Sequence, residues 1–380
     1  MLSAMDEPSA SAPAPAPHQR RKRYAGRNPR TFEEKYKEHQ PDRYADTVAK
    51  VLASGKTPAG SHRPIMVAEI LEVLAPQPGE LAVDATLGYG GHAREILARV
   101  RPGGRLIGLD ADPLELPKAE ARLRELGFGP DIFTAQRSNF AGLPQVLAKF
   151  FSPSEVAGRA GSPLPAARSD AIDGADVILA DLGVSSMQID DPARGFSVKF
   201  EGPLDMRMNP QRGQPASVLL AKIKPGALAA LLAENADEPH ADVLAPALAG
   251  KAFATTRALA AAIRAALPRL NQEAGDLSIR RVFQALRIAV NDEFSALDTF
   301  LRNLPTCLNP GGRAAILTFH SGEDRRVKKA FAAGLRDGLY ADIAHEVIRP
   351  TADERHANPR SAPAKLRWAR RAEKNLLTTV

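Results

Sequence analysis

Short apolar segments that end in polar or glycine-rich turns recur along the chain from about residue 62 onward. Such continuous apolar runs are typical of strands that are buried on both faces of a parallel sheet. The segments expected as strands are Leu81–Asp84, Arg105–Asp110, Asp131–Ala135, Ala175–Asp181 and Gly312–Phe319. Helical stretches separate the early segments at the distances of βαβ units, so the pattern predicts an α/β fold.

The spacing of the last two predicted strands indicates an insertion. About 130 residues separate Asp181 from Gly312, far more than the dozen or so that one crossover connection requires. Inside this gap, the period of apolar residues and the high alanine content predict several helices. They are expected over residues 227–233, 241–251 and 256–267. The insertion is therefore predicted to be a helical subdomain.

The pattern divides the chain into four regions. We expect a basic extension over 1–60, a first part of the main domain over 61–208, the helical substrate-recognition subdomain over 209–279 and a second part of the main domain over 280–380. Two more strand-like runs lie in the last region, at 343–349 and 364–372. They predict an antiparallel pair at the edge of the sheet, an ending that a plain nucleotide-binding domain lacks.

Two segments of low sequence complexity are expected to contribute little to the core. Residues 1–60 pass from an Ala/Pro-rich tract into a basic cluster at 20–23. We predict that this extension is mostly disordered, with a short polar helix over 32–39. Its basic cluster is either a solvated tail or an arm that touches RNA. The stretch 152–170, rich in Pro, Ala, Gly and Ser, predicts a surface loop.

The segment 81–92 carries the most specific local signal in the chain. A short strand runs there into a glycine-rich turn, and the turn opens a helix over about 93–100. Gly88, Gly90 and Gly91 allow the positive φ and the close backbone approach that a turn beneath a ligand requires. The helix N-terminus directs free N–H groups at the same ligand. Strand, turn and helix together predict a nucleoside-cofactor site rather than an ordinary tight turn.

Two acidic residues refine this prediction. Asp110 ends the next strand, 22 positions after Gly88, where a carboxylate can accept hydrogen bonds from the two ribose hydroxyls. Asp84 stands four residues before Gly88, at the end of the first strand. A carboxylate there would repel a pyrophosphate but would attract, directly or through water, the sulfonium and α-amino groups of S-adenosylmethionine. The alternative for Asp84 is a turn cap.

Composition and charge limit the classes of function. The chain has 380 residues, of which 44% are hydrophobic, so it can hold more than one domain. Its single cysteine, Cys307, excludes an intrachain disulfide and a thiolate metal cluster, which fits a reducing cytoplasm. No apolar run reaches the length of a membrane span, and no signal peptide is apparent.

The charge of the chain bears on its partners. The net charge of +7 favours a polyanionic partner. The sequence leaves a homodimer open.

A third polar cluster follows the fourth predicted strand. It comprises Asp181, Ser185, Ser186, Gln188, Asp190 and Asp191. Ligands of open α/β sheets bind beyond the carboxyl ends of the strands. We therefore expect Asp84, Asp110, Asp181 and the segment 319–321 to converge on one pocket, although Asp181 could instead cap its turn. Ser321 and Asp324 are better explained as caps of the helix that follows.

Several longer motifs carry a specific resemblance to one protein family. They are His62–Glu69, Asp84–His92, Gly108–Pro113, Asp181–Asp191, Arg194–Ser197, Gly202–Met208, Phe283–Glu293 and Phe319–Ser321. In this order, from about residue 62 to 371, they closely resemble the bacterial 16S rRNA (cytosine-N4)-methyltransferases, the MraW or RsmH family. The resemblance implies a Rossmann-like class I S-adenosylmethionine-dependent methyltransferase sheet with a helical insertion. It also implies methylation of the exocyclic N4 of a cytosine in the decoding centre of 16S rRNA.

The resemblance carries the family's cofactor contacts onto residues that are all present. They are Gly90, Gly91, His92, Asp110, Phe140, Asp181 and Gln188. Four features depart from the family's pattern. Met187 stands in place of the usual proline, Gly322 stands in place of the usual leucine, and the 1–60 extension and the 152–170 loop are additions. Met187 lies on the target-base side, and no departure removes a matched cofactor contact.

The implied reaction needs help from the protein. The N4 lone pair of cytosine is delocalised into its ring, so it attacks a sulfonium methyl poorly unless an acceptor draws on an N–H and aligns the reacting atoms. Asp181 is the first candidate for this role, and it can serve the cofactor as well. The lesser candidates are Asp190, Asp191 and His320. Phe196 and Phe200 either stack on an extruded base or belong to the core.

Two other classes of protein share some of these features. A nicotinamide-dependent dehydrogenase would use the glycines and Asp110, but it leaves Asp84, the cluster after Asp181 and the terminal strand pair unexplained. A non-catalytic RNA-binding protein would keep the positive charge without intact cofactor motifs. We therefore predict a cytoplasmic rRNA methyltransferase that uses S-adenosylmethionine, acts on the small ribosomal subunit and needs neither a metal nor a membrane.

Overall fold

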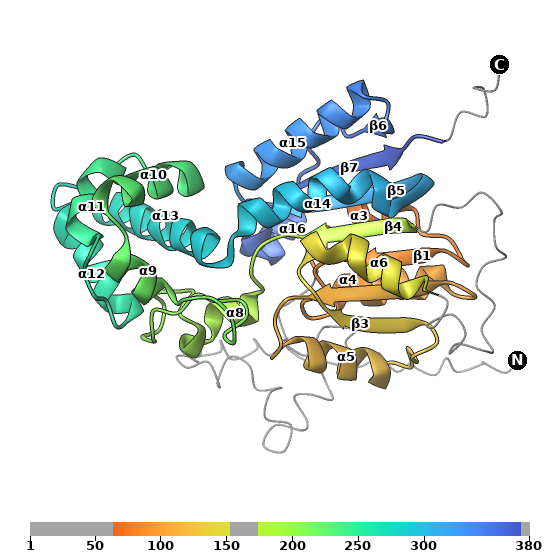
Figure 1. The fold of residues 1–380 in the computed structure, drawn as a ribbon, viewed down its shortest axis with the longest axis horizontal. Helices are drawn as coiled ribbons and strands as arrows, with labels where there is room; N and C mark the ends of the chain where they lie inside the picture. Colours follow the sequence, from red (N-terminus) through yellow and green to blue (C-terminus); the bar gives the residue numbers. More distant parts are fainter. Residues whose placement is uncertain (1–63, 153–173, 374–380) are drawn as a thin grey trace, which may run out of the picture.

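The computed structural model describes residues 64–152 and 174–373, which form a sheet covered by helices and a separate helical part (Figure 1). The predictions for the 1–60 extension, for its helix over 32–39 and for nearly all of the 152–170 loop lie outside the described residues. No helix among the described residues is long and apolar enough to cross a membrane.

The sheet has seven strands in the order β3-β2-β1-β4-β5-β7-β6. Their bounds are β1 (Leu81–Asp84), β2 (Arg105–Asp110), β3 (Phe133–Arg137), β4 (Ala175–Asp181), β5 (Leu308–Thr318), β6 (Tyr340–Ile343) and β7 (Lys365–Arg371). Strands β1 to β5 are parallel, whereas β7 runs antiparallel to both β5 and β6. The predicted Rossmann-like sheet is confirmed, and its terminal strands form the antiparallel pair.

The bounds of several strands differ from the prediction. The third strand begins at Phe133 instead of residue 131, and β5 begins at Leu308, before its most apolar segment. The penultimate strand covers 340–343 rather than 343–349. Beyond it, Ala344 N–H donates to the carbonyl oxygen of Trp368, and Ile348 forms an isolated bridge to Leu366, so the run after Ile343 touches β7 without continuing the strand.

Helices cover both faces of the sheet. The helical segments outside the insertion are α3 (Val67–Leu74), α4 (Gly91–Val100), α5 (Leu116–Glu125), η2 (Phe140–Gly142), α6 (Leu143–Phe150), α8 (Ser186–Asp190), η3 (Pro192–Arg194), α14 (Glu293–Cys307), α15 (Ser321–Arg336), α16 (Ala352–Ala357) and η4 (Pro359–Ser361). Helices α3, α4 and α5 bury apolar residues in one core cluster, and α6, α14 and α15 do so in another.

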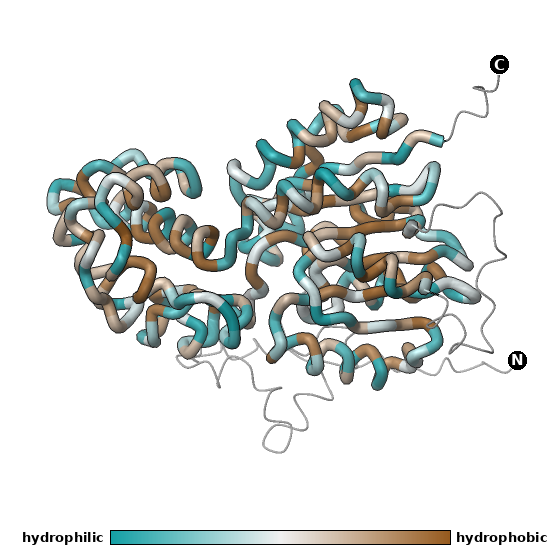
Figure 2. Tube along the Cα trace, in the orientation of Figure 1, coloured by the Kyte–Doolittle hydropathy of each residue, from teal (hydrophilic) through white to brown (hydrophobic). Residues whose placement is uncertain are grey.

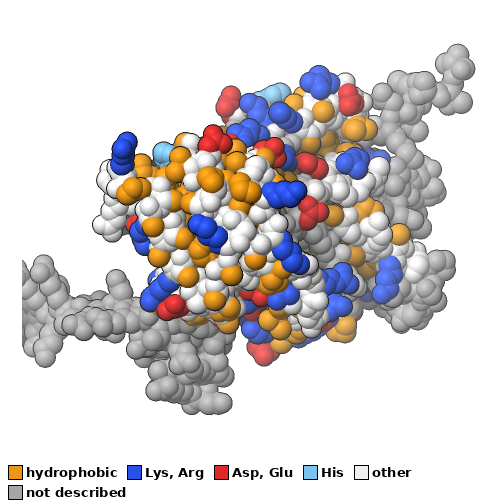
Figure 3. Space-filling model, turned by 60° about the vertical axis from the view of Figure 1, so that its left-hand side comes forward, with side chains coloured by type: hydrophobic (Ala, Val, Ile, Leu, Met, Phe, Trp, Pro, Cys, Tyr) orange, Lys and Arg blue, Asp and Glu red, His pale blue; other side chains and the backbone are white. Residues whose placement is uncertain are grey.

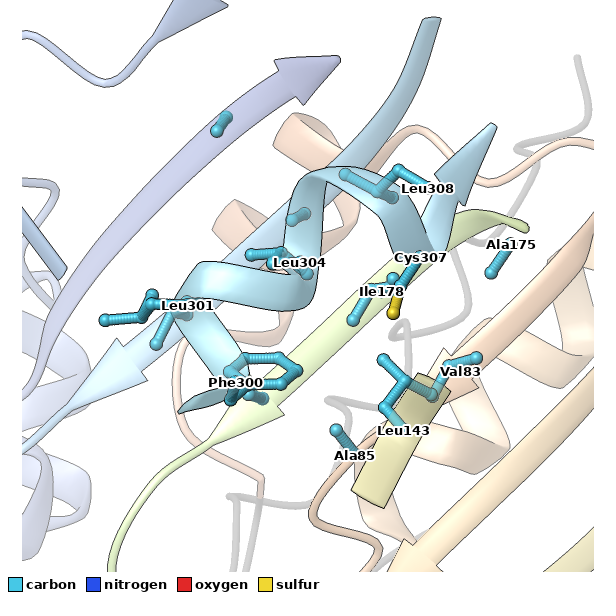
Figure 4. Close-up of a cluster of buried hydrophobic side chains, with 14 of the residues drawn as sticks. Val83, Ala85, Leu143, Ala175, Ile178, Phe300, Leu301, Leu304, Cys307 and Leu308 are labelled. Carbon is cyan, nitrogen blue, oxygen red and sulfur yellow. The ribbon is translucent and has the colours of Figure 1, made fainter. Parts of the chain in front are cut away.

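Alternation along the strands divides the sheet residues between these two clusters. In β4, Val177 and Leu179 belong to the cluster of α3, α4 and α5, whereas Ile178 and Ala180 belong to that of α14. Figure 4 shows Ile178 beside Cys307 beneath α14. Both faces of each central strand are thus apolar, and brown predominates in the middle of these strands in Figure 2.

The helical part has a core of its own. It contains α9 (Ala216–Lys222), α10 (Pro225–Ala236), α11 (Ala241–Leu248), α12 (Thr256–Ala266) and α13 (Gln272–Asn291). Its buried cluster draws on residues from Phe196 to Leu286 and is distinct from the two clusters of the sheet. The boundary expected at 279 falls inside α13, because Val282 and Phe283 on the same helix pack into this cluster. Asp292, in the left-handed conformation with φ of 50°, separates α13 from α14.

Candidate active site

A cavity of about 680 Å³ lies where the carboxyl ends of the parallel strands meet the helical part. Its wall includes residues that follow β1, β2, β3, β4 and β5, as expected for the ligand crevice of an open α/β sheet. The helix α13 and the start of α14 complete the wall on the other side. The volume falls in the range of cofactor and drug-sized sites, roughly 300–1,000 Å³.

The glycine-rich turn between β1 and α4 forms one side of the cavity. Gly88 and Gly90 have φ of 49° and 83°, in the region that residues with a side chain rarely adopt. A Cβ on Gly91 would lie 2.6 Å from Pro64 Cγ, so a larger residue does not fit. Gly88 and Gly91 line the cavity, whereas Gly90 faces Leu123 behind the turn. Gly90 therefore supports the turn rather than the wall of the cavity.

Asp110 holds the glycine turn and faces the cavity at the same time. Its Oδ2 accepts a hydrogen bond from the backbone N–H of Gly88 at 2.9 Å, and its Oδ1 accepts one from that of Asp112 at 2.8 Å. Burial raises the pKa of Asp110 to about 6, against the opposing effect of these two hydrogen bonds. Each carboxylate oxygen has a second lone pair, so Asp110 can still accept hydrogen bonds from ligand hydroxyls.

Asp84 lies behind the wall of the cavity. Its side chain is 1% exposed, it is absent from the cavity lining, and its Oδ1 accepts a hydrogen bond from Thr86 N–H at 3.2 Å. Burial raises its pKa to about 6. This is the turn-capping arrangement that the sequence left open. Asp84 is therefore not placed to touch a ligand directly. Its negative charge can still attract a cationic ligand across the cavity wall.

Asp181 and His92 meet in the cavity. Asp181 ends β4, where its backbone N–H donates to Thr86 Oγ1 at 2.6 Å, and its side chain is 28% exposed toward the cavity. Its Oδ2 lies 3.4 Å from His92 Nε2. Burial would lower the pKa of His92, but the contact with Asp181 and the charges of Asp181 and Asp84 outweigh burial and raise it. This part of the cavity thus gathers negative charge around one imidazole.

Gln188 and Phe140 also line the cavity. Gln188 closes a capping box with Ser185 at the start of α8: its Oε1 accepts from Ser185 N–H at 2.9 Å. Its Nε2 donates to Asp112 Oδ2 at 2.7 Å, so most of its amide is already engaged. The ring of Phe140 packs edge-on against Phe300, with 5.5 Å between the ring centroids.

A buried ion pair joins the loop after β2 to the helical part. Arg194 Nη1 donates to Asp112 Oδ2 at 2.8 Å, with the side chains 8% and 0% exposed. The Nη2 of Arg194 donates to the carbonyl oxygens of Arg207 and Met208 at 3.1 and 2.9 Å. Met208 N–H in turn donates to Asn291 Oδ1 at 2.7 Å, at the end of α13. Hydrogen bonds therefore run continuously from the end of β2 to α13.

The far wall of the cavity comes from α13 and α14. Arg280, Arg287 and Asn291 line it from α13, and Glu293 and Phe294 line it from α14. Arg287 donates from Nε and Nη2 to the two carboxylate oxygens of Glu293, both at 2.9 Å. The pKa of Arg287 rises because its attraction to Glu293 outweighs its burial. The sequence assigned no role to these residues, although most of them lie in the conspicuous motif Phe283–Glu293.

Comparison with known proteins now identifies the family. A sequence profile of the MraW methylase family matches residues 59–372. "Ribosomal RNA small subunit methyltransferase H 1" of Lachnoclostridium phytofermentans is 47% identical over 364 residues, which cover 93% of this chain and 93% of that protein. "Ribosomal RNA small subunit methyltransferase H 2" of Alkaliphilus metalliredigens is 47% identical over 93% of this chain and 98% of that protein. The chain belongs to the MraW methylase family.

The methylase is an S-adenosylmethionine-dependent enzyme, and the cavity fits this cofactor. The glycine turn and the N-terminus of α4 present backbone to the ligand, and Asp110 keeps lone pairs for the ribose hydroxyls. The carboxylate of Asp181 suits the positively charged end of the cofactor. When bound, S-adenosylmethionine supplies an electrophilic methyl group. Among the described residues, no group of His, Cys, Asp and Glu side chains is arranged to hold a metal ion.

The methylase shares part of its amino-terminal segment with these relatives. The alignments cover 93% of the chain, more than residues 59–380 alone can provide. The prediction that the whole 1–60 extension is an addition is therefore wrong for these two proteins. Among solved structures, TrmN from Thermus thermophilus is 13% identical, with a TM-score of 0.36 over 80% of this chain and 48% of that one, a likeness too distant to inform function.

Two of the methylase's candidate residues lie off the cavity. The carboxylate of Asp190, at the end of α8, is 1% exposed and accepts from Arg360 Nη2 at 3.0 and 2.9 Å, so it is held in the interior. His320 caps α15 by accepting from Glu323 N–H through Nδ1, and its Nε2 lies 3.1 Å from Glu323 Oε1. Two residues close to His320 in the chain, Phe319 and Glu323, line the cavity instead. Asp190 and His320 are therefore not in position to touch a substrate there.

The structure corrects further expectations for the methylase. The cap of α15 is His320, whereas Ser321 donates to Asp237 in the helical part at 2.7 Å and Asp324 pairs with Lys365 and Arg367. Asp191 caps the short helix η3.

The two phenylalanines considered for base stacking do not line the cavity. Phe196 is buried in the core of the helical part, and Phe200 lies near the ammonium group of Lys199, 5.3 Å from its ring centroid. The core interpretation therefore holds for Phe196.

Proposed function

We propose that this methylase transfers a methyl group to the exocyclic N4 of a cytosine in the decoding centre of 16S rRNA, and that it acts on small ribosomal subunits in the cytoplasm. The printed names of its relatives refer to the RNA of the small subunit. The observation that carries the proposal is a single cavity that reaches from the glycine turn to α13. Such a cavity has room for a cofactor on the sheet side and for a nucleotide on the helical side.

Asp181 is the residue that orients the amine. It ends a central strand, its side chain is exposed to the cavity, and its Oδ2 lies 3.4 Å from His92 Nε2. A carboxylate accepts a hydrogen bond from an N4 N–H and so holds the nitrogen lone pair toward the methyl group. The contact with His92 fixes the direction of the carboxylate. Most of the rate then comes from alignment rather than from full removal of a proton before attack.

The target cytosine enters from the helical side. Enzymes that act on a base take it out of its stack, at a cost of about a few kcal/mol for unstacking. The wall formed by α13 and α14 faces the glycine turn across the cavity, so a base extruded between them meets the cofactor. The decoding centre is folded RNA, and recognition depends on its shape and its phosphates more than on base edges.

Methyl transfer from tritiated S-adenosylmethionine tests this function. The substrates are small ribosomal subunits, free 16S rRNA, cytidine and duplex DNA, and the product is identified by nucleoside mass spectrometry. We expect N4-methylcytidine in assembled or nearly assembled subunits, with none in cytidine or DNA. Activity should fall steeply with added salt, since phosphate contacts release counterions. Detection of 5-methylcytidine instead, or equal labelling of DNA and subunits, would defeat the proposal.

A further inference from the structure

We propose that Arg280 binds a phosphate of the RNA strand that carries the target nucleotide. This inference rests on the proposed function. It assigns contact with the RNA backbone to one part of the cavity wall. Arg280, Arg287 and Asn291 line the cavity from one helix, α13. Their spacings of seven and four residues place them on the same face of that helix. Arg280 therefore belongs to the surface that the substrate must pass.

The charge of Arg280 is not compensated within the described residues. Three arginines line the cavity: Arg280, Arg287 and Arg360. The guanidinium of Arg287 is bound by both oxygens of Glu293, and that of Arg360 by both oxygens of Asp190. The side chain of Arg280 is exposed and forms no hydrogen bond or ion pair with any other described residue. Its five N–H donors are thus available for an anion from outside.

The position of Arg280 along α13 matches a phosphate rather than the base. With a rise of 1.5 Å per residue, Arg280 lies about 10 Å from Arg287, on the side away from the joint with α14. An extruded base goes into the cavity, whereas its sugar and the flanking phosphates stay at the mouth. A guanidinium matches two phosphate oxygens with two parallel hydrogen bonds, which makes arginine the typical residue for this contact.

The surface of the helical part carries positive charge that suits a long polyanion. Figure 3, in which the helical part comes forward, shows Lys and Arg side chains spread over the visible face, with apolar side chains between them. Arg280 and Arg287 are the basic residues of α13 and α14 that line the cavity, and of these two only Arg287 is paired within the described part of the chain, with Glu293.

Arg302 provides a matched control. It is an exposed arginine on the neighbouring helix α14, and it does not line the cavity. Replacing it removes the same charge from the protein as replacing Arg280. A difference between the two variants therefore reports a local contact instead of a change in the overall field of the protein.

The experiment compares Arg280→Ala, Arg280→Lys and Arg302→Ala with the wild type. Affinity for small ribosomal subunits is measured over a range of salt concentrations, together with kcat, S-adenosylmethionine affinity and thermal stability. For Arg280→Ala we expect subunit affinity to fall roughly tenfold to a hundredfold and the slope of log affinity against log salt to decrease by about 1. Arg280→Lys should keep most of the slope. Cofactor affinity and stability should stay unchanged, and Arg302→Ala should behave as the wild type.

Two results would overturn the inference. One is wild-type affinity and slope in Arg280→Ala, and the other is an equal loss in Arg280→Ala and Arg302→Ala. The outcome is separable from that of the proposed function. If the wild type forms no N4-methylcytidine in small subunits, the proposed function fails whatever the variants do. If it does form that product and Arg280→Ala keeps its affinity, only the role of Arg280 fails.

Discussion

Arg194 donates a hydrogen bond to the carboxylate of Asp112 at 2.8 Å in the interior of the protein. The same carboxylate oxygen accepts from Gln188, and the same guanidinium holds two carbonyl groups at the start of the helical part. One buried ion pair thus fixes the loop after β2, the helix after β4 and the chain that leads into the insertion. Its energetic role can be measured directly.

Arg194→Met should lower the free energy of unfolding by about 3–5 kcal/mol, because it leaves the carboxylate of Asp112 buried without its partner. Urea denaturation followed by circular dichroism measures this loss. The double variant Asp112→Asn/Arg194→Met should be more stable than Arg194→Met alone, since the uncompensated charge is gone. An unchanged denaturation midpoint in Arg194→Met would show that the pair contributes nothing.

Asp110→Ala should weaken the binding of S-adenosylmethionine by about 1.5–3 kcal/mol through the loss of charge-assisted hydrogen bonds. The structure adds a second reason, because Asp110 also holds the N–H of Gly88 and so fixes the glycine turn. Isothermal titration calorimetry gives the dissociation constant, and circular dichroism confirms that the variant is folded. If a folded Asp110→Ala binds the cofactor as tightly as the wild type, Asp110 has no place in the site.

Asp181→Asn should lose far more turnover than cofactor affinity. The amide keeps the size of the side chain but is a weaker acceptor for the N4 N–H, and an interaction made mainly in the transition state affects the chemical step. Single-turnover methylation of small subunits measures the rate, and calorimetry measures cofactor binding. Equal losses in both would mean that Asp181 serves the cofactor alone, and full activity would remove it from the reaction.

Cofactor affinity should fall as the pH drops through about 6. Burial raises the pKa of Asp110 and of Asp84 to about 6, so both lose their negative charge below that pH. The ionised forms attract the cationic cofactor and its hydroxyls, and binding therefore favours high pH. Calorimetry between pH 5 and pH 8, at roughly half-unit steps, tests this. Asp110→Asn should show a shallower profile, and equal wild-type affinity at both ends of the range would contradict the prediction.

The same two groups affect folding with the opposite sign. Their pKa values are about 6 in the folded state against 3.8 for the unfolded carboxyl, so the folded state binds more protons between these values. Their contribution to stability therefore decreases as the pH rises from 3.8 to about 6 and is constant above that. Asp84→Asn should remove one such step, which denaturation at several pH values would detect.

The cofactor half of the site could be predicted from the sequence because its geometry is local. The turn that carries Gly88 and Gly90 lies within one βα unit, and Asp110 ends the strand that follows it. Parallel pairing of neighbouring strands then brings Asp110 and Asp181 to one edge. Each step follows from the short-range pattern and from the rule that ligands bind at the carboxyl ends of strands.

The helical half could not be predicted in the same way, because its contacts join residues far apart in the chain. Arg194 meets Asp112 across 82 positions, and Met208 meets Asn291 across 83. Proximity in sequence was misleading for Asp190, which follows Asp181 closely but is held by Arg360, 170 positions away. The same holds for Ser321, whose hydroxyl reaches Asp237 in the insertion instead of capping its own helix.

The order of the strands has a consequence for how the molecule is made on the ribosome. Strands β4 and β5 are neighbours in the sheet, yet the entire helical part is synthesised between them. At roughly 5–20 residues per second, the open edge of β4 waits on the order of ten seconds for its partner. The core of the helical part draws only on residues that precede β5, so it is complete before that partner emerges. The helical wall of the cavity can therefore fold before β5 pairs with β4 and completes the parallel part of the sheet.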